Sequence, residues 1–198
     1  MIKTGIFGGA FNPPHIGHAA IAKEAAEYLK LRKLMIIPSF ESPHKHTKLM
    51  PFDDRAEMCR LTFENISDSC ETEICDIERR MGGVSYTINT IRELKRLYPD
   101  RELYLIIGSD MLFSFRDWFK YESILKECKV VAVPRSGDSM TDMMEFAAEI
   151  GRIRVMPANI PGVSSTEIRE RIVKGEPLTG LVTEKTAEYI AANGLYKE

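Results

Sequence analysis

The sequence predicts an α/β fold in which a doubly wound parallel sheet is followed by a helical extension. Short apolar runs rich in β-branched residues alternate with amphipathic helical patterns along most of the chain. Strands and helices that alternate in this way are joined by right-handed crossovers, which place helices on both faces of one sheet. The last stretch, about 163–198, changes to a helical pattern without a strand, and this predicts the extension.

Six strands are expected, and most of them end at Gly, Pro or Ser, as buried parallel strands tend to do. The candidate runs are IKTGIF (2–7), LMIIPS (34–39), ETEICDI (71–77), ELYLIIG (102–108), KVVAVP (129–134) and RIRVMP (152–157). Because ligands of doubly wound sheets bind beyond the carboxyl ends of the strands, the residues that follow these runs are the candidates for a site.

Helical patterns lie between the strands. The segments 17–31 and 88–97 carry apolar residues at spacings of three and four, and Asp53 and Asp54 are expected to cap a further helix. The apolar face of that helix is expected to include Met58, Leu61 and Phe63. For the segment 136–151 the sequence leaves two roles open, packing on the sheet and forming an interface.

The length of 198 residues suits one domain, which we expect to span 1–198 with its helical part at about 163–198. The 27 basic and 29 acidic residues give a formal net charge of −2, which argues against a nucleic acid polymer as partner. The sequence shows no secretory signal and no run near the ~20 apolar residues that cross a bilayer. We therefore expect a cytoplasmic protein with no membrane partner, and a homo-oligomer is left open. The four cysteines lack metal-site spacing, so reduced thiols and no bound metal are expected.

The stretch GIFGGAFNPPHIGH, residues 5–18, is the leading candidate for a site because it follows the first strand. Gly8 and Gly9 allow backbone N–H groups to approach an anion, although a tight structural turn would use glycines as well. Pro13 and Pro14 fix φ and exclude a regular helix until His15.

His15 and His18 lie three residues apart at the start of a helix and therefore on one of its faces. Three interpretations fit this spacing. A zinc site lacks a further recognisable ligand nearby, and a cap or packed ring would be purely structural. We favour two imidazole donors facing a phosphate, because the positive end of the helix dipole would act in the same direction.

Polar residues also follow later strands. Lys45 lies in SPHKH after the second strand, and Asp110 follows IIGS after the fourth. Ser164 opens VSSTEIR as an expected N-cap, with Arg169 one turn into the helix. Each has a plain alternative as a solvated loop or cap residue, and Trp118 is either a core residue or a platform for an aromatic base.

Together, GGAFNPPHIGH, SPHK, SYTINT, IIGSD, the tryptophan segment, VPRSG, VSSTEIR and YIAANGLY resemble the nicotinate-nucleotide adenylyltransferase family of the HxGH nucleotidylyltransferase superfamily. The match covers nearly the whole chain and implies a Rossmann-like fold of the HxGH type. It also implies transfer of the adenylyl group of ATP, accompanied by Mg²⁺, to nicotinate mononucleotide in NAD biosynthesis, with nicotinate adenine dinucleotide and pyrophosphate as products. Asn89 departs from the family's Asp, and Ser42 replaces a proline of PPHK.

The resemblance implies roles for individual residues as well. Catalysis would depend on His15, His18, Lys45 and Arg169. ATP would be bound by Gly8, Gly9, Ala10, Phe11, His15, His18, Gly108, Asp110, Arg135, Ser164, Ser165, Thr166, Ile168 and Arg169. The mononucleotide would be bound by Asn12, Lys45, Ser85, Tyr86, Thr87 and Trp118.

The chemistry implied needs no general base, because a phosphate monoester is already mostly a dianion at pH 7. A direct in-line attack without a covalent intermediate is therefore expected. Two other acceptors stay open at this point, nicotinamide mononucleotide and 4′-phosphopantetheine. A non-catalytic nucleotide-binding protein of this fold would be expected to lose its phosphate-contacting residues, whereas His15, His18, Lys45 and Arg169 are all present.

Overall fold

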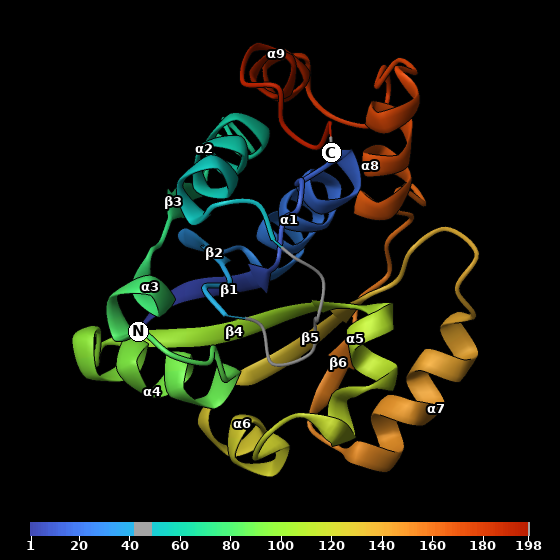
Figure 1. Cartoon of the computed structure of the whole chain (residues 1–198). Coiled ribbons are helices and arrows are strands. Elements are labelled where there is room, and N and C mark those ends of the chain that lie inside the picture. Colours follow the sequence, from blue (N-terminus) through green and yellow to red (C-terminus); the bar gives the residue numbers. More distant parts are fainter. Residues whose placement is uncertain (42–48, 198) are drawn as a thin grey trace.

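The computed structural model describes residues 1–41 and 49–197, and it confirms the predicted α/β fold. Six parallel strands form one sheet in the order β3-β2-β1-β4-β5-β6, with helices above and below it (Figure 1). The strands are β1 (Ile2–Gly9), β2 (Lys33–Pro38), β3 (Glu71–Ile74), β4 (Arg101–Gly108), β5 (Lys129–Val133) and β6 (Ile153–Val155). The order changes direction between β1 and β4, which is the switch point where ligands of doubly wound sheets bind.

The helices cover both faces of this sheet. In chain order they are α1 (Ile16–Leu29), α2 (Phe52–Thr62), α3 (Ile77–Met81), α4 (Thr87–Leu97), α5 (Ser109–Phe113), the 3₁₀ helix η1 (Phe115–Asp117), α6 (Tyr121–Glu127), α7 (Met140–Ile150), α8 (Ser165–Lys174) and α9 (Glu184–Ala192). Figure 1 shows α1, α2, α8 and α9 on one side of the sheet and α3, α4, α6 and α7 on the other.

Two separate hydrophobic cores result from the alternation of side chains along the central strands. Phe7 and Ile106 belong to the core that includes the buried face of α1, whereas Ile6 and Leu105 belong to the core that includes α4. Successive residues of a strand point to opposite faces, so strands buried on both sides are apolar at nearly every position. This is why the strands were visible as continuous apolar runs.

Three sequence predictions about elements need correction or completion. The third strand ends at Ile74, three residues earlier than predicted, because Ile77 already begins α3. Asp53 and Asp54 do not cap α2; they lie in its first turn, where carboxylates face the positive end of the helix dipole. The open segment 136–151 forms α7, which packs against β6 and α5 and has Met143 in the second core.

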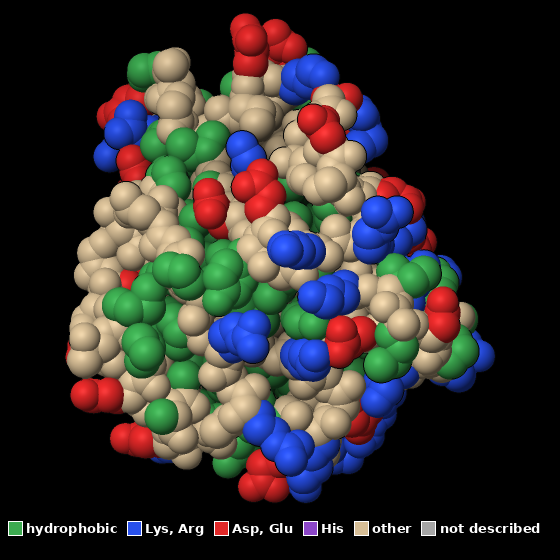
Figure 2. Space-filling view, turned by 180° about the vertical axis from the view of Figure 1, so that it is seen from behind, with side chains coloured by type: hydrophobic (Ala, Val, Ile, Leu, Met, Phe, Trp, Pro, Cys, Tyr) green, Lys and Arg blue, Asp and Glu red, His purple; other side chains and the backbone are tan. Residues whose placement is uncertain are grey.

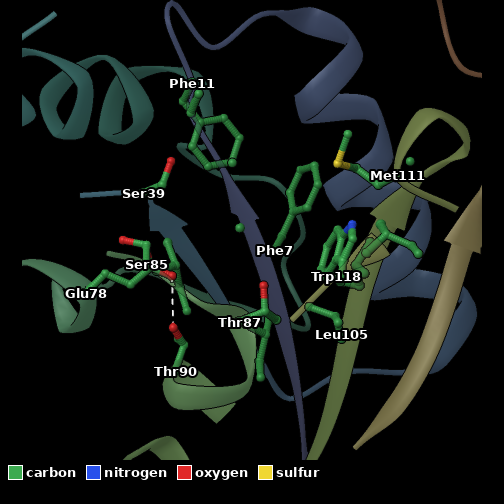
Figure 3. Close-up of a pocket in the computed structure, with 18 of the residues that line it drawn as sticks. Phe7, Phe11, Ser39, Glu78, Ser85, Thr87, Thr90, Leu105, Met111 and Trp118 are labelled. Atoms are coloured by element: carbon green, nitrogen blue, oxygen red, sulfur yellow. Dashed lines mark hydrogen bonds between the residues drawn. The ribbon is translucent and has the colours of Figure 1, made fainter. Parts of the chain in front are cut away.

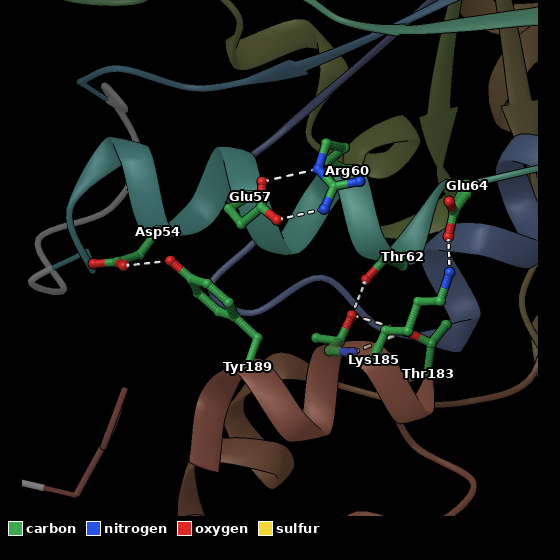
Figure 4. A network of polar contacts seen from close by, with 9 residues as sticks. Asp54, Glu57, Arg60, Thr62, Glu64, Thr183, Lys185 and Tyr189 are labelled. Atoms are coloured by element: carbon green, nitrogen blue, oxygen red, sulfur yellow. Dashed lines mark hydrogen bonds and ion pairs between the residues drawn. The ribbon is translucent and has the colours of Figure 1, made fainter. Parts of the chain in front are cut away.

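The predicted helical extension is present as α8 and α9, and α9 is tied to α2 by polar contacts (Figure 4). The Tyr189 hydroxyl donates to Asp54 Oδ1 over 2.9 Å, and the hydroxyls of Thr62 and Thr186 lie 2.8 Å apart in a buried contact. An ion pair between Lys185 and Glu64 flanks them. These contacts hold α9 against α2, on the same side of the sheet.

The face opposite to the view of Figure 1 shows acidic and basic side chains mixed beside a hydrophobic area (Figure 2). No single sign of charge dominates it, as a net charge of −2 would suggest. None of the helices in the described part of the chain is long and apolar enough to span a membrane. The thiols of Cys59, Cys70, Cys75 and Cys128 are free, as predicted.

Candidate active site

A cavity of about 1350 Å³, counting the open space at its mouth, lies at the carboxyl ends of β1 and β4. Figure 3 shows Phe7 and Phe11 on one side of it, Trp118 and Met111 on another, and Ser85, Thr87 and Glu78 along a third. The turn after β1 is therefore part of the cavity wall, as the switch-point rule predicts.

Most of the predicted site residues of the described chain line this cavity. They are Gly8, Gly9, Ala10, Phe11, His18, Ser85, Tyr86, Thr87, Gly108, Asp110, Trp118, Arg135 and Ser165. Ser164 lines an adjoining hollow that shares Asp110 and Arg135 with the cavity. Five others, Asn12, His15, Thr166, Ile168 and Arg169, are not among the residues that line it. Lys45, together with Ser42, lies outside the described residues.

The two histidines form a reciprocal cap at the start of α1. The Nδ1 atom of His15 accepts from the backbone N–H of His18 over 3.3 Å, and His18 Nδ1 accepts from the N–H of His15 over 3.3 Å. Their rings stack with centroids 3.7 Å apart. Since each Nδ1 accepts a backbone proton, the ring proton of a neutral imidazole must be on Nε2. The pair therefore caps the helix, and in each neutral ring the donor is Nε2.

His15 is buried, and this determines its charge. Burial, assisted by the positive charge of Arg135, lowers the pKa of His15 to about 4. At neutral pH its ring is uncharged and offers one proton rather than two. The prediction that both imidazoles donate to a phosphate therefore requires His15 to donate as an uncharged ring.

The buried neutral His15 is expected to make stability depend on pH. Its pKa is about 4 in the fold and about 6.5 in the unfolded chain. The unfolded state therefore binds more protons between these values, and the free energy of unfolding decreases as pH falls from 6.5 to 4, by roughly 3 kcal/mol from this group. Urea unfolding of the wild type and of His15→Asn, which keeps a capping oxygen without the titration, measures the difference. Equal pH slopes for the two proteins would contradict this assignment.

The end of β4 brings a carboxylate and a guanidinium together at the cavity. Asp110 Oδ1 lies 3.3 Å from Arg135 Nη2. A Cβ at position 108 would stand 2.7 Å from that same carboxylate oxygen and 3.2 Å from the same nitrogen. A side chain at position 108 would therefore require the ends of these two flexible side chains to shift.

The N-terminal half of α8 is hydrogen-bonded to the turn before α1 that contains Pro13. Ser165 Oγ donates to the Pro13 carbonyl over 2.8 Å, and Arg169 Nη1 donates to the Asn12 carbonyl over 2.7 Å. Ser164 caps the helix as predicted, accepting from the Glu167 N–H over 3.1 Å. Segments about 150 residues apart in the sequence therefore meet at one wall of the site.

The structure does not bring the Ile168 side chain to the cavity. It is fully buried in a small core with Val163 and Val182, so it packs α8 against the neighbouring parts of the extension. Asn12 is also buried, and its side-chain oxygen accepts from the Met50 N–H and the Tyr196 hydroxyl. The sequence pattern cannot separate such supporting residues from those that face the ligand.

A further group of aromatic rings surrounds Trp118, which lines the cavity. Trp118 is half-buried and lies 5.2 Å, centroid to centroid, from Phe115, while Tyr86 and Phe119 lie 4.6 Å apart. Trp118 is thus neither a plain core residue nor fully exposed. Asn89, the departure noted in SYTINT, is exposed on α4 and is not among the lining residues.

Sequence reasoning missed two buried charged residues next to the site, Arg55 and Glu78. Arg55 is 1% exposed and donates to three backbone carbonyls, and Glu78 lines the cavity. Burial raises the pKa of the Glu78 carboxyl, opposed by hydrogen bonds from Ser85 and Thr90. Both residues stand among other charged side chains in FDDRAEMCRLT and IERRM, so no local signal separates them from solvated helix faces.

The described residues contain no group of three or more His, Cys, Asp or Glu side chains placed to hold a metal ion. Asp110 is the carboxylate on the polar side of the cavity, and it is partnered by Arg135. A site with this single carboxylate on its polar side fits a divalent cation whose other ligands are water and the phosphates of a nucleotide, as for Mg²⁺.

Comparison with known proteins places this chain in a family. The family model described as cytidylyltransferase-like matches residues 6–171. A probable nicotinate-nucleotide adenylyltransferase of Carboxydothermus hydrogenoformans is 36% identical over 200 residues, covering 98% of each chain. The chain belongs to the nicotinate-nucleotide adenylyltransferase family. A second relative with the same description, from Clostridium tetani, is 37% identical over 202 residues, and the match covers 100% of both chains.

Solved structures agree with the fold of this family. The nicotinic acid mononucleotide adenylyltransferase of Plasmodium falciparum, complexed with NaAD, matches with a TM-score of 0.79 at 17% identity, covering 99% of this chain and 98% of the other. A putative nicotinate-nucleotide adenylyltransferase from Vibrio parahaemolyticus matches with a TM-score of 0.72 at 22% identity, covering 100% and 97%. At these identities the likeness concerns the fold.

Proposed function

We propose that this protein transfers the adenylyl group of ATP to nicotinate mononucleotide, forming nicotinate adenine dinucleotide and pyrophosphate. Family membership over the full chain supports this reaction. The observation that carries it in the structure is a cavity whose wall combines phosphate-binding groups with aromatic rings. We assign the helix N-termini, His18 and Arg135 to a phosphate end, and Trp118 with its neighbouring rings to an acceptor end.

The phosphate end is suited to ATP. The N-termini of α1 and α8 meet there, since His18 and Ser165 both line the cavity, and helix N-termini favour anions. His18 and Arg135 add donors from the wall, while His15 caps α1 and Arg169 lies in α8. In the proposed mechanism these groups stabilise charge on the transferring phosphoryl group, and the mononucleotide phosphate attacks in line with pyrophosphate departure. Lys45 is proposed as a further cation.

Mg²⁺ is proposed to enter as part of the ATP substrate. When bound, it would neutralise charge on the phosphates. Asp110 would offer it a carboxylate oxygen, which is a type of ligand that Mg²⁺ prefers. We further propose that 1–198 act as one domain. A cytoplasmic location stays a prediction from the sequence, and the sequence leaves a homo-oligomer open.

Pyrophosphate release with ATP and each of three acceptors tests the function. Nicotinate mononucleotide is expected to give the highest kcat/KM, above nicotinamide mononucleotide and 4′-phosphopantetheine. A flat aromatic acceptor is favoured by the Trp118 end of the cavity. A preference for 4′-phosphopantetheine, or no turnover with any acceptor, would overturn the proposal.

Trp118→Ala is expected to raise the KM for the mononucleotide about tenfold, which corresponds to about 1.4 kcal/mol of lost stacking. The KM for ATP should change less than twofold, since the indole is assigned to the acceptor and not to ATP. Trp118→Phe keeps a ring and is the matched control. If only the ATP KM changed, the indole would not be beside the pyridine ring.

A further inference from the structure

One peptide group just beyond β2 is held by two buried charges of opposite sign. The carbonyl of Ser39 accepts from Arg55 Nη2 over 2.8 Å. The N–H of Phe40, which belongs to the same peptide group, donates to Glu78 Oε2 at 3.4 Å and to Ser85 Oγ at 3.2 Å. The cation thus faces the negative end of the peptide dipole, and the carboxylate faces its positive end.

Arg55 joins this peptide group to two other parts of the site. Its Nη1 donates to the Ala10 carbonyl over 2.8 Å, beyond the end of β1, and its Nε donates to the Met50 carbonyl over 2.9 Å. In the described part of the chain, no carboxylate lies within ion-pair distance of this guanidinium. Glu78 is the acidic residue whose charge acts on it electrostatically.

Glu78 joins the same peptide group to the segment that begins α4. Its Oε1 accepts from the Thr90 hydroxyl over 2.9 Å. Ser85 Oγ, besides its bond to Phe40, accepts from the N–H of Glu41 over 3.2 Å, and the Ser85 N–H donates to the Glu41 carbonyl over 2.8 Å. Both carboxylate oxygens accept from protein donors, so Glu78 connects the Phe40 N–H to α4.

We propose that Arg55 and Glu78 are positioning residues, which hold the ends of β1 and β2 and the start of α4 in register for mononucleotide binding. This inference rests on the proposed function. The three segments that the pair joins supply Ala10, Ser39, Ser85 and Thr87 to the cavity wall. An uncompensated buried charge is strongly unfavourable, so each of the two charges stabilises the placement of the other.

The decisive variant is Glu78→Gln, which removes the charge but keeps the size and an acceptor oxygen. Three explanations predict different results for the dissociation constant of nicotinate mononucleotide, measured through the fluorescence of Trp118, the single tryptophan. A positioning role predicts a rise of about tenfold, the effect of roughly 1.4 kcal/mol. Simple charge repulsion predicts tighter binding, because a carboxylate near an anionic ligand is removed. A purely structural role predicts a lower melting temperature with unchanged binding.

The matched control is Glu57→Gln on α2. Glu57 forms a bidentate pair with Arg60 at the surface, away from the cavity, and should leave binding unchanged. The KM for ATP should change less than twofold in Glu78→Gln. Unchanged or tighter mononucleotide binding in this variant would overturn the inference, whereas a wild type that does not bind the mononucleotide would overturn the proposed function instead.

A double-mutant cycle tests whether the two charges act together. Arg55→Met alone should weaken mononucleotide binding at least as much as Glu78→Gln, and the double variant should be less impaired than the product of both effects. Independent, multiplicative effects would contradict the pairing. If Arg55→Met does not fold, the result for Glu78→Gln still decides the inference.

Discussion

His18→Ala is expected to lower the turnover number at saturating substrates by at least about 10²-fold, the usual effect of losing one transition-state donor. His18 lines the phosphate end of the cavity, and its ring is oriented by the bond from the His15 N–H to Nδ1 and by edge contact with Phe11, 5.0 Å away. The loss should appear in kcat more than in KM, because charge on the transferring group is greatest in the transition state.

His18→Asn tests the donor role of His18 separately from its role in capping α1. An Asn at this position offers an oxygen to the His15 N–H but does not place a proton where Nε2 stands. Both variants should therefore be slow, while only His18→Ala should lower the melting temperature. Near-normal turnover in either variant, measured by pyrophosphate release, would show that His18 serves the helix alone.

Gly8→Ala is expected to reduce kcat/KM for ATP roughly 30-fold, equivalent to about 2 kcal/mol, with an unchanged melting temperature. A Cβ at this position meets nothing in the protein closer than the Ile37 carbonyl oxygen at 3.9 Å, so the fold has room for it. Gly8 lines the cavity, and the methyl group would occupy the space through which its backbone approaches the nucleotide.

Gly5→Ala, on the same strand, is the matched control with the opposite outcome. A Cβ there would lie 2.6 Å from Leu31 Cδ1 and 2.8 Å from Leu34 Cδ1, inside the first core. Overpacking of this kind destabilises by about 1–3 kcal/mol, while the folded fraction should keep a normal KM for ATP. Thermal unfolding and steady-state kinetics of both variants distinguish the two roles. A destabilised Gly8→Ala with normal kinetics would remove Gly8 from the proposed ATP site.

The site could be predicted in part because its residues follow strands. Gly8, Gly9 and Gly108 come directly at the ends of β1 and β4, and parallel strands bring such ends to one edge of the sheet. His15 and His18 were visible through their spacing. Ile168 and Asn12 show the limit of the same reasoning, because residues of a motif that support the site share its pattern with those that line it.

The sequence by itself determined the order of strands and helices, the α/β class and the family, since periodicity and short motifs are local properties of the chain. Only the tertiary structure decided which residues support the site, because Arg55, Glu78 and Tyr196 owe their importance to contacts across 16 to 184 positions. A buried charge is recognised by what surrounds it, and its sequence neighbours on a helix are mostly at the surface. The packing of the fold, and not any local pattern, places Glu78 in the cavity wall and Arg55 beside it.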